Sequence, residues 1–144
     1  MTSSPALVVN LQEVGLESIA CVGGKNASLG EMLRELASSG VRVPEGFATT
    51  AEAYRLFVAS NGLEQPLRAI LKELDSNDLH SLQAAGTASR HLLRQATLPA
   101  PLEQSIRSAY QALGSPAVAV RSSATAEDLP EASFAGQQIG RAHV

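Results

Sequence analysis

Two cationic residues stand beside glycine-bearing loops at distant points of this 144-residue chain. The first is Arg121, which ends an alternating run over 117–121 that is typical of a strand and precedes the small-residue loop 133–137. Small residues let a backbone approach a ligand, and arginine donates several hydrogen bonds to an anion. The pattern favours a ligand with many anionic oxygens, such as a polyphosphate. A surface hairpin in which Arg121 pairs with Glu127 or Asp128 explains the same residues equally well.

The second cation is Lys25, which follows Gly23 and Gly24 at the expected start of a helix. The glycines allow close approach of an anion, the helix N-terminus adds partial positive charge, and the lysine adds a full charge. The segment is not a Walker A loop, because Ile19 replaces its first glycine and Asn26 its magnesium-binding hydroxyl. A lone Gly-Gly-Lys is usually a turn with a solvated lysine. Paired with Arg121, however, it meets the charge requirements of phosphoryl transfer.

Other polar residues give weaker candidates for chemistry. His80 and His91 are not an i,i+4 metal pair, and no cysteine or carboxylate cluster joins them, so no metal ligand is assigned. Ser122 and Ser123 have no base nearby in sequence, which favours hydroxyls that bond loop backbone or phosphate over a nucleophile. The acidic residues within 127–131 are of a type that binds magnesium, but a solvated acidic loop is the simpler interpretation.

The composition indicates one domain with an aliphatic core, since 44% of residues are hydrophobic and 3% are aromatic. A net charge of −3 without a long basic run argues against a nucleic-acid partner. The lone cysteine, Cys21, cannot form an internal disulfide, fits a reducing compartment, and is expected to be a half-buried apolar residue. No signal peptide and no apolar run of about 20 residues is visible, so we expect a cytoplasmic protein without a membrane partner. The sequence does not decide the oligomeric state, and a homo-oligomer is one of the open alternatives.

Hydrophobic periodicity predicts a chain dominated by helices. The expected helices run from the Gly23 turn to a stop at Gly40, from a Thr49 cap to Asn61, and over 63–74, 79–93 and 102–113. The expected strands are 6–10 and 117–121. The ambiguous segment 11–22 is interpreted as loop and turn, and 41–48 as an extended or turning connection. Many helices and few strands indicate an α+β domain, with helices packed beside a small sheet.

Four segments in a fixed order carry a resemblance to a known family. They are VGGKNASLGEM (22–32), VPEGFATT (43–50), VRSSATAED (120–128) and ASFAGQQ (132–138). Together they closely resemble the N-terminal nucleotide-binding domain of the phosphoenolpyruvate synthase (pyruvate, water dikinase) family, from about Leu7 to Gln138. The wider group of dikinases also contains pyruvate, phosphate dikinase and rifampicin phosphotransferase. The uninterrupted segments 23–32 and 124–130 look most like the synthases.

The resemblance implies the first part of an ATP-grasp-like domain that binds ATP. In the family, the residues that match Lys25 and Arg121 contact ATP phosphates, and the loop that matches Ser133, Gly136 and Gln137 covers them with backbone N–H groups. The family's enzymes pass a pyrophosphoryl group from ATP to a histidine on a separate domain and release phosphate to water. They then phosphorylate pyruvate, so the products are phosphoenolpyruvate, AMP and phosphate. The implied small molecules are therefore ATP with Mg²⁺, and pyruvate.

The chain departs from the family in length. We expect residues 1–138 to be the truncated first part of the nucleotide-binding domain, without the acidic magnesium ligands, the histidine domain and the pyruvate barrel. None of the three histidines matches the phosphohistidine motif, so no catalytic residue is assigned and the 144 residues alone are expected to be inactive.

The last six residues leave the family pattern. We interpret 139–144 as an artefactual tail, because one reverse translation of it is the opening of a common sequencing-library adapter. Two alternatives to a synthase stay open at this point. One is a domain of the pyruvate, phosphate dikinase or rifampicin phosphotransferase type, and the other is a non-catalytic nucleotide-binding module.

Overall fold

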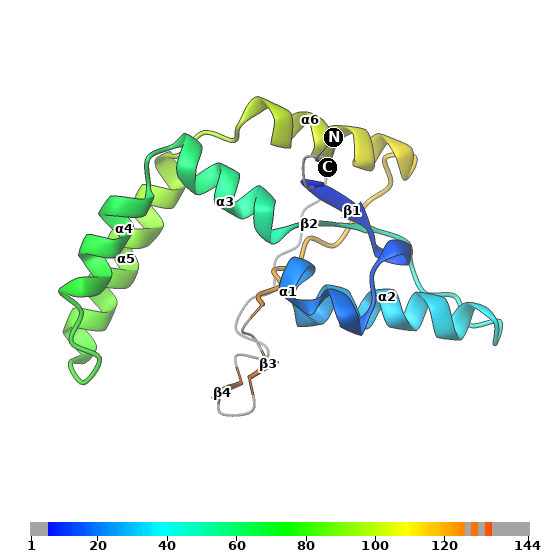
Figure 1. Ribbon diagram of the computed structural model, residues 1–144, viewed down its shortest axis with the longest axis horizontal. Coiled ribbons are helices and arrows are strands. Elements are labelled where there is room, and N and C mark those ends of the chain that lie inside the picture. Colours follow the sequence, from blue (N-terminus) through cyan, green and yellow to red (C-terminus); the bar gives the residue numbers. More distant parts are fainter. Residues whose placement is uncertain (1–5, 126–127, 130–131, 134–144) are drawn as a thin grey trace. The chain divides into compact units, whose positions relative to one another are not determined.

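The computed structural model describes residues 6–125, 128–129 and 132–133 (Figure 1). The chain forms two compact units, one made of residues up to Ala53 together with those from Pro101 onward, the other of Tyr54–Ala100. Within the described residues, helices dominate and the strands form two small two-stranded sheets. The α+β class predicted from periodicity is therefore confirmed.

The first unit contains an antiparallel pair of strands, β1 (Val8–Asn10) and β2 (Phe47–Thr49), with Val9 opposite Ala48. Strand β1 confirms the prediction over 6–10. Strand β2 lies partly in a segment that the sequence indicates only as an extended connection. Two backbone hydrogen bonds hold the segment in place, from Leu11 N–H to Gly46 O at 2.9 Å and from Thr50 N–H to Leu7 O at 3.0 Å. Pairing with a distant strand thus makes β2, and a local pattern cannot reveal it.

Helical turns occupy most of 11–22, the segment interpreted from sequence as loop and turn. They are the 3-10 turns η1 (Leu11–Glu13) and η2 (Leu16–Ser18) and the short helix α1 (Ile19–Val22), after which the long helix α2 (Gly24–Ala37) begins. The turns agree with that interpretation, whereas the helix α1 was not predicted, because an element of four residues is too short to show an apolar period. Helix α2 was correctly predicted.

The core of the first unit lies between α2 and the turns that precede it. Its buried residues are Leu11, Val14, Val22, Ala27, Leu33 and Ala48. Helix α2 buries Ala27, Gly30 and Leu33, at the three-residue spacing of one helix face. At Gly30 an added Cβ would overlap the carbonyl oxygen of Val14 and lie 2.5 Å from that of Leu11. The helix therefore packs directly on the backbone of the turns, which only a glycine at this position permits.

Thr50 begins helix α3 (Ala51–Ser60) and joins it to the first strand. Its Oγ1 accepts a hydrogen bond from Ala53 N–H at 3.2 Å and donates one to Ala6 O at 2.8 Å. The predicted cap at Thr49 is wrong by one residue, because Thr49 is the last residue of β2. A buried threonine with both bonds made stabilises the strand-to-helix junction.

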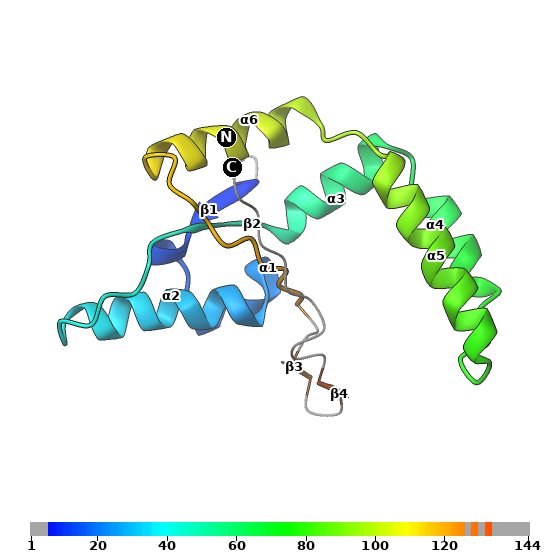
Figure 2. The ribbon, with the colours of Figure 1, turned by 180° about the vertical axis from the view of Figure 1, so that it is seen from behind.

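In the second unit, which also contains most of α3, the helices α4 (Glu64–Lys72) and α5 (Leu79–Gln95) lie side by side in both views (Figures 1 and 2). The Asp78 carboxylate caps α5 by accepting hydrogen bonds from His80 N–H at 3.0 Å and Ser81 N–H at 3.2 Å. Both helices and the cap region 76–78 were correctly predicted.

Helix α6 (Ala100–Ala112) ends in a turn at Gly114, whose φ is +83°. The strand predicted over 117–121 is wrong, because the chain makes only isolated bridges at Val118 and Arg121. The apolar alternation misleads here, since Val120 is 55% exposed and no buried face selects it. Farther on, β3 (Asp128–Leu129) pairs antiparallel with β4 (Ala132–Ser133).

Candidate functional site

The two cation-bearing segments meet in the first unit. Gly24 N–H, at the start of α2, donates a hydrogen bond to Ala124 O at 3.4 Å. The ammonium of Lys25 donates one to Ser122 O at 3.5 Å, across 97 positions of sequence. The segment that begins at Arg121 thus lies against the N-terminus of α2, as the pairing of the two motifs in the sequence analysis requires.

Gly23 makes this contact possible in two ways. Its φ of 80° and ψ of 163° lie in a backbone region that is essentially restricted to glycine. A Cβ here would overlap Ser123 Oγ and lie 2.9 Å from both the N and O atoms of Ala124. The space that glycine leaves is thus filled by the arginine-bearing segment. Gly23 therefore permits the contact between the two segments. This role is additional to the close approach of an anion that its place before Lys25 predicts.

The predicted site residues differ in what the structure describes of them. Lys25 is half-buried and Arg121 is exposed. Ser133 is the last residue of β4, while Gly136 and Gln137 lie outside the described residues. The N-terminus of α2 adds partial positive charge near the ammonium of Lys25. Lys25 and the segment that begins at Arg121 are therefore in contact, and the binding role of all these residues stays a prediction.

Ser123 has the most unusual polar group in this region. Its Oγ is buried, and within the described part of the chain it is the buried side-chain oxygen for which no hydrogen-bond partner is found. Most buried polar groups in proteins are hydrogen-bonded, so an exception beside two cation-bearing segments needs an explanation. The sequence shows this hydroxyl but gives no signal for its burial.

The turn between α1 and α2 is held by its own hydrogen bonds. Asn26 Nδ2 donates to Val22 O at 2.9 Å, and Gly23 N–H donates to Ile19 O at 2.9 Å. These bonds satisfy carbonyl groups at the end of α1 and fix the direction in which the chain enters α2. On the same short helix Cys21 is exposed, so the expectation of a half-buried cysteine is wrong. A helix of one turn covers only one face, which here buries Val22.

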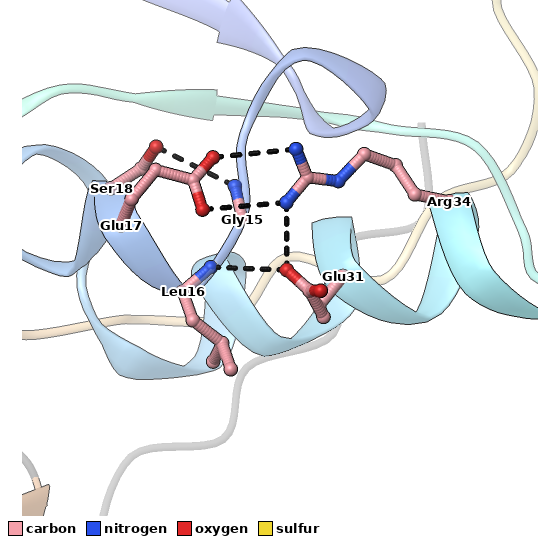
Figure 3. A network of polar contacts seen from close by, with 6 residues as sticks. All are labelled: Gly15, Leu16, Glu17, Ser18, Glu31 and Arg34. Carbon is pink, nitrogen blue, oxygen red and sulfur yellow. Dashed lines mark hydrogen bonds and ion pairs between the residues drawn. The ribbon is translucent and has the colours of Figure 1, made fainter.

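A network around Arg34 ties α2 to the turn before α1 (Figure 3). Its guanidinium donates to the carboxylate of Glu17 at 3.3 and 3.4 Å and to that of Glu31 at 2.7 Å. Glu31 also accepts from Leu16 N–H at 3.3 Å. At Gly15 a Cβ would overlap this guanidinium, so the glycine leaves room for it. The network fixes the segment that leads to the Gly23 turn.

Electrostatics in this network are those of a surface ion pair. A backbone hydrogen bond and then the Arg34 guanidinium hold the pKa of Glu17 below its usual value. Hydrogen bonds to Glu31 and Glu17 raise the pKa of Arg34. Because Arg34 and Glu17 are largely exposed, water screens the attraction and the network contributes orientation more than stability.

Other features of the described residues lie away from this site. A cavity of about 550 Å³ is lined by residues at the far end of α2 and the loop after it, and it contains neither Lys25 nor Arg121. In the described ranges no group of three or more His, Cys, Asp or Glu side chains has an arrangement suited to a metal ion. None of the described helices combines the length and apolarity needed to span a membrane.

Local sequence patterns missed several residues that shape the site. Gly15 lies against the guanidinium of Arg34, and Gly30 lies against the carbonyl oxygen of Val14. In each pair the neighbour belongs to another part of the chain, so a local pattern does not show why glycine is needed. A glycine inside a helical pattern, as at Gly30, is a usable signal of close packing, but it does not name the neighbour. Ala124 acts through its backbone carbonyl, for which a side-chain pattern gives no signal.

Comparison with known proteins connects this geometry to a family. Residues 19–140 match the family model described as "Pyruvate phosphate dikinase, AMP/ATP-binding domain". The phosphoenolpyruvate synthase of Deinococcus radiodurans is 58% identical over 124 residues, which are 85% of this chain and 16% of that protein. That of Synechocystis sp. is 51% identical over 143 residues, which cover 92% of this chain and 18% of the relative.

The similarity extends to more distant synthases. The phosphoenolpyruvate synthase of Escherichia coli is 46% identical over 140 residues, with 94% of this chain and 18% of that protein covered. The chain thus spans less than a fifth of the length of these relatives. The resemblance drawn from four motifs is confirmed, and the family model covers both Lys25 and Arg121. The chain belongs to the pyruvate phosphate dikinase AMP/ATP-binding domain family.

Proposed function

We propose that this domain binds the phosphates of ATP for a phosphoenolpyruvate synthase, which converts pyruvate, ATP and water to phosphoenolpyruvate, AMP and phosphate. Membership of the AMP/ATP-binding family and the names of its relatives support the proposal. The observation that carries it is the hydrogen bond from Lys25 Nζ to Ser122 O. This bond brings an ammonium and a helix N-terminus to the segment that starts with Arg121.

In this proposal the two cations act on one polyphosphate. The ammonium of Lys25 and the guanidinium of Arg121 neutralise phosphate oxygens from separate segments, and the guanidinium donates two parallel hydrogen bonds. Backbone N–H groups of the loop that holds Ser133, Gly136 and Gln137 would cover the same phosphates. Because phosphoryl transfer depends on positioning and on charge stabilisation, these residues prepare ATP for attack by a group from elsewhere in the enzyme.

The histidine that accepts the pyrophosphoryl group, the pyruvate site and the second half of an ATP-grasp-like domain are assigned to other parts of the full-length enzyme. The 144 residues are accordingly proposed to have no dikinase activity of their own. ATP is expected to bring Mg²⁺ with it. We assign no magnesium ligand to residues of this chain. We also propose that the enzyme is located in the cytoplasm.

The proposal is tested by assaying the two half-reactions of the full-length enzyme separately. Lys25→Ala and Arg121→Ala each remove a charge-assisted hydrogen bond worth about 1.5–3 kcal/mol, so ATP-dependent phosphorylation should fall about tenfold to a few hundredfold. Arg121→Lys should recover only part of the loss. The double variant should lose less than the product of the two effects if both cations bind one polyphosphate.

Lys72→Ala and Arg94→Ala are matched controls, because both residues lie at the ends of helices in the second unit and are exposed. Transfer from phosphohistidine to pyruvate should stay unchanged in every variant, since it uses another domain. Normal ATP-dependent phosphorylation in either single variant, or an equal loss in the pyruvate half-reaction, would contradict the proposal.

A further inference from the structure

The Ser123 hydroxyl is a buried polar group that the proposed function does not yet use. Burial removes it from water, and among the described residues no group replaces the lost hydrogen bond. Such a group lowers stability, because the desolvation of the hydroxyl is not offset. Native structures keep few of these groups, and a binding role is one reason for which they are kept.

The position of this hydroxyl is defined by its neighbours. Ser123 Oγ occupies the space that a side chain on Gly23 would need, so it lies directly against the turn that opens α2. The residues on either side of Ser123 are fixed to the same turn, Ser122 by the Lys25 ammonium and Ala124 by the Gly24 N–H. The oxygen therefore sits within a frame of backbone contacts, two residues after Arg121.

We propose that Ser123 donates a hydrogen bond to the polyphosphate of ATP, in the same site as Lys25 and Arg121. The inference rests on the proposed function, since it assumes that this site binds ATP. Phosphate oxygens at neutral pH are acceptors, and a serine hydroxyl can donate to one after a change of rotamer that leaves the backbone in place. Binding of ATP then supplies a partner that no described residue provides for this hydroxyl.

This role predicts an unusual combination of effects for Ser123→Ala. Removing the hydroxyl deletes an unsatisfied group, so the ligand-free protein should be as stable as the parent or more stable. The same change removes one hydrogen bond to a charged ligand, and affinity for ATP should fall about tenfold to a hundredfold. A hydroxyl that only fills space or binds a structural water would leave ATP affinity unchanged.

The experiment measures ATP binding and thermal unfolding of the full-length enzyme, parent and variants, with tripolyphosphate as a second probe that lacks the nucleoside. Ser123→Ala should weaken both probes while the melting temperature without ligand does not fall. Ser123→Cys keeps the size of the side chain with a weaker donor, so it should bind with intermediate affinity. Ser108→Ala, an exposed serine of α6, is the matched control.

The outcomes separate the inference from the function on which it rests. Unchanged affinity in Ser123→Ala, or a loss of affinity that comes with a lower melting temperature in both Ser123 variants, overturns the role of the hydroxyl alone. If the parent enzyme binds neither ATP nor tripolyphosphate, the proposed function fails and the inference fails with it. Weaker binding of both probes at preserved stability is the result that supports it.

Discussion

The glycines of the two units differ in what surrounds them. In the first unit, an added Cβ at Gly23 or Gly30 would overlap atoms of another segment. In the second unit, a Cβ at Gly62 would meet nothing within 4 Å, and the nearest atoms to one at Gly86 belong to the side chain of Arg90, at 3.2 Å. Gly23 and Gly30 thus permit contact between segments, which neither glycine of the second unit does. Gly40 and Gly114, also in the first unit, likewise meet nothing within 4 Å.

The two units also differ in how many hydrophobic residues they bury. The core cluster lies entirely in the first unit, whereas among the described residues of the second unit only Leu63 is a buried hydrophobic residue. Close backbone contact removes water and fixes geometry within a few tenths of an ångström. The region around α2 is therefore suited to hold charged groups at defined positions, as a phosphate site requires. Substitutions of these glycines test the comparison directly.

Gly30→Ala should have the largest effect. The new methyl group would meet the carbonyl oxygens of Val14 and Leu11, which belong to backbone and cannot rotate away. We expect a loss of about 3 kcal/mol or more in unfolding free energy, at the upper end of the range for overpacked sites. Urea unfolding followed by circular dichroism measures it. A loss below about 1 kcal/mol would mean that α2 can shift away from the turns, and that the close contact is not required.

Gly23→Ala should cause the next largest loss of unfolding free energy, about 2–3 kcal/mol. It combines an unfavourable backbone conformation with overlap on Ser123 and Ala124. Gly62→Ala is the comparison for a positive φ without overlap, since Gly62 has a φ of +61° and open space around it. It should cost only about 1–2 kcal/mol. The same urea titration compares the two variants. Equal losses would show that neither the overlap with Ser123 nor the more restricted backbone conformation of Gly23 adds to the cost.

Local signals were enough to predict most of the fold. Helices α2, α4, α5 and α6 each have an apolar face long enough to show a helical period, and Asp78 is a cap that the sequence displays. The strand β2 was missed because pairing with a distant strand defines it, and the helix α1 because four residues are too few to show an apolar period. The predicted strand over 117–121 failed because nothing in the sequence shows whether an alternating run has a buried side.

The candidate site was predictable in part. The types of Lys25 and Arg121 and their glycine-bearing neighbours pointed to a shared anion, and the structure brings their segments into contact. The fit between Gly23 and Ser123 was not predictable, because it depends on the backbone conformation of one residue and the burial of another nearly a hundred positions away. Residue types thus indicate the chemistry, and tertiary contact decides which atoms lie within reach.

Asp78→Ala tests the second unit through a local contact. The variant loses two hydrogen bonds to the first turn of α5, and the expected cost is about 1 kcal/mol, the usual value for an N-cap. Amide hydrogen exchange should increase at the start of α5, while exchange in α2 stays unchanged. Faster exchange in α2 as well would show that the stabilities of the two units are coupled, so that the units do not respond separately to substitution. Asp78→Asn is the control, because asparagine also caps helices.

Gly86→Ala should have the smallest effect and the opposite sign. Gly86 lies in the interior of α5, where glycine costs about 0.5–1 kcal/mol relative to alanine because its unfolded backbone is freer. The neighbour of the new methyl group would be the end of the Arg90 side chain, which can move at little cost. We therefore expect slower hydrogen exchange in α5 and a slightly higher urea midpoint. Because Gly30→Ala makes the same chemical change in α2 with the opposite outcome, the pair isolates the surroundings of the glycine as the cause. If Gly86→Ala lowered the stability, we would infer a backbone contact on this face of α5. The two units would then no longer differ in the surroundings of their glycines.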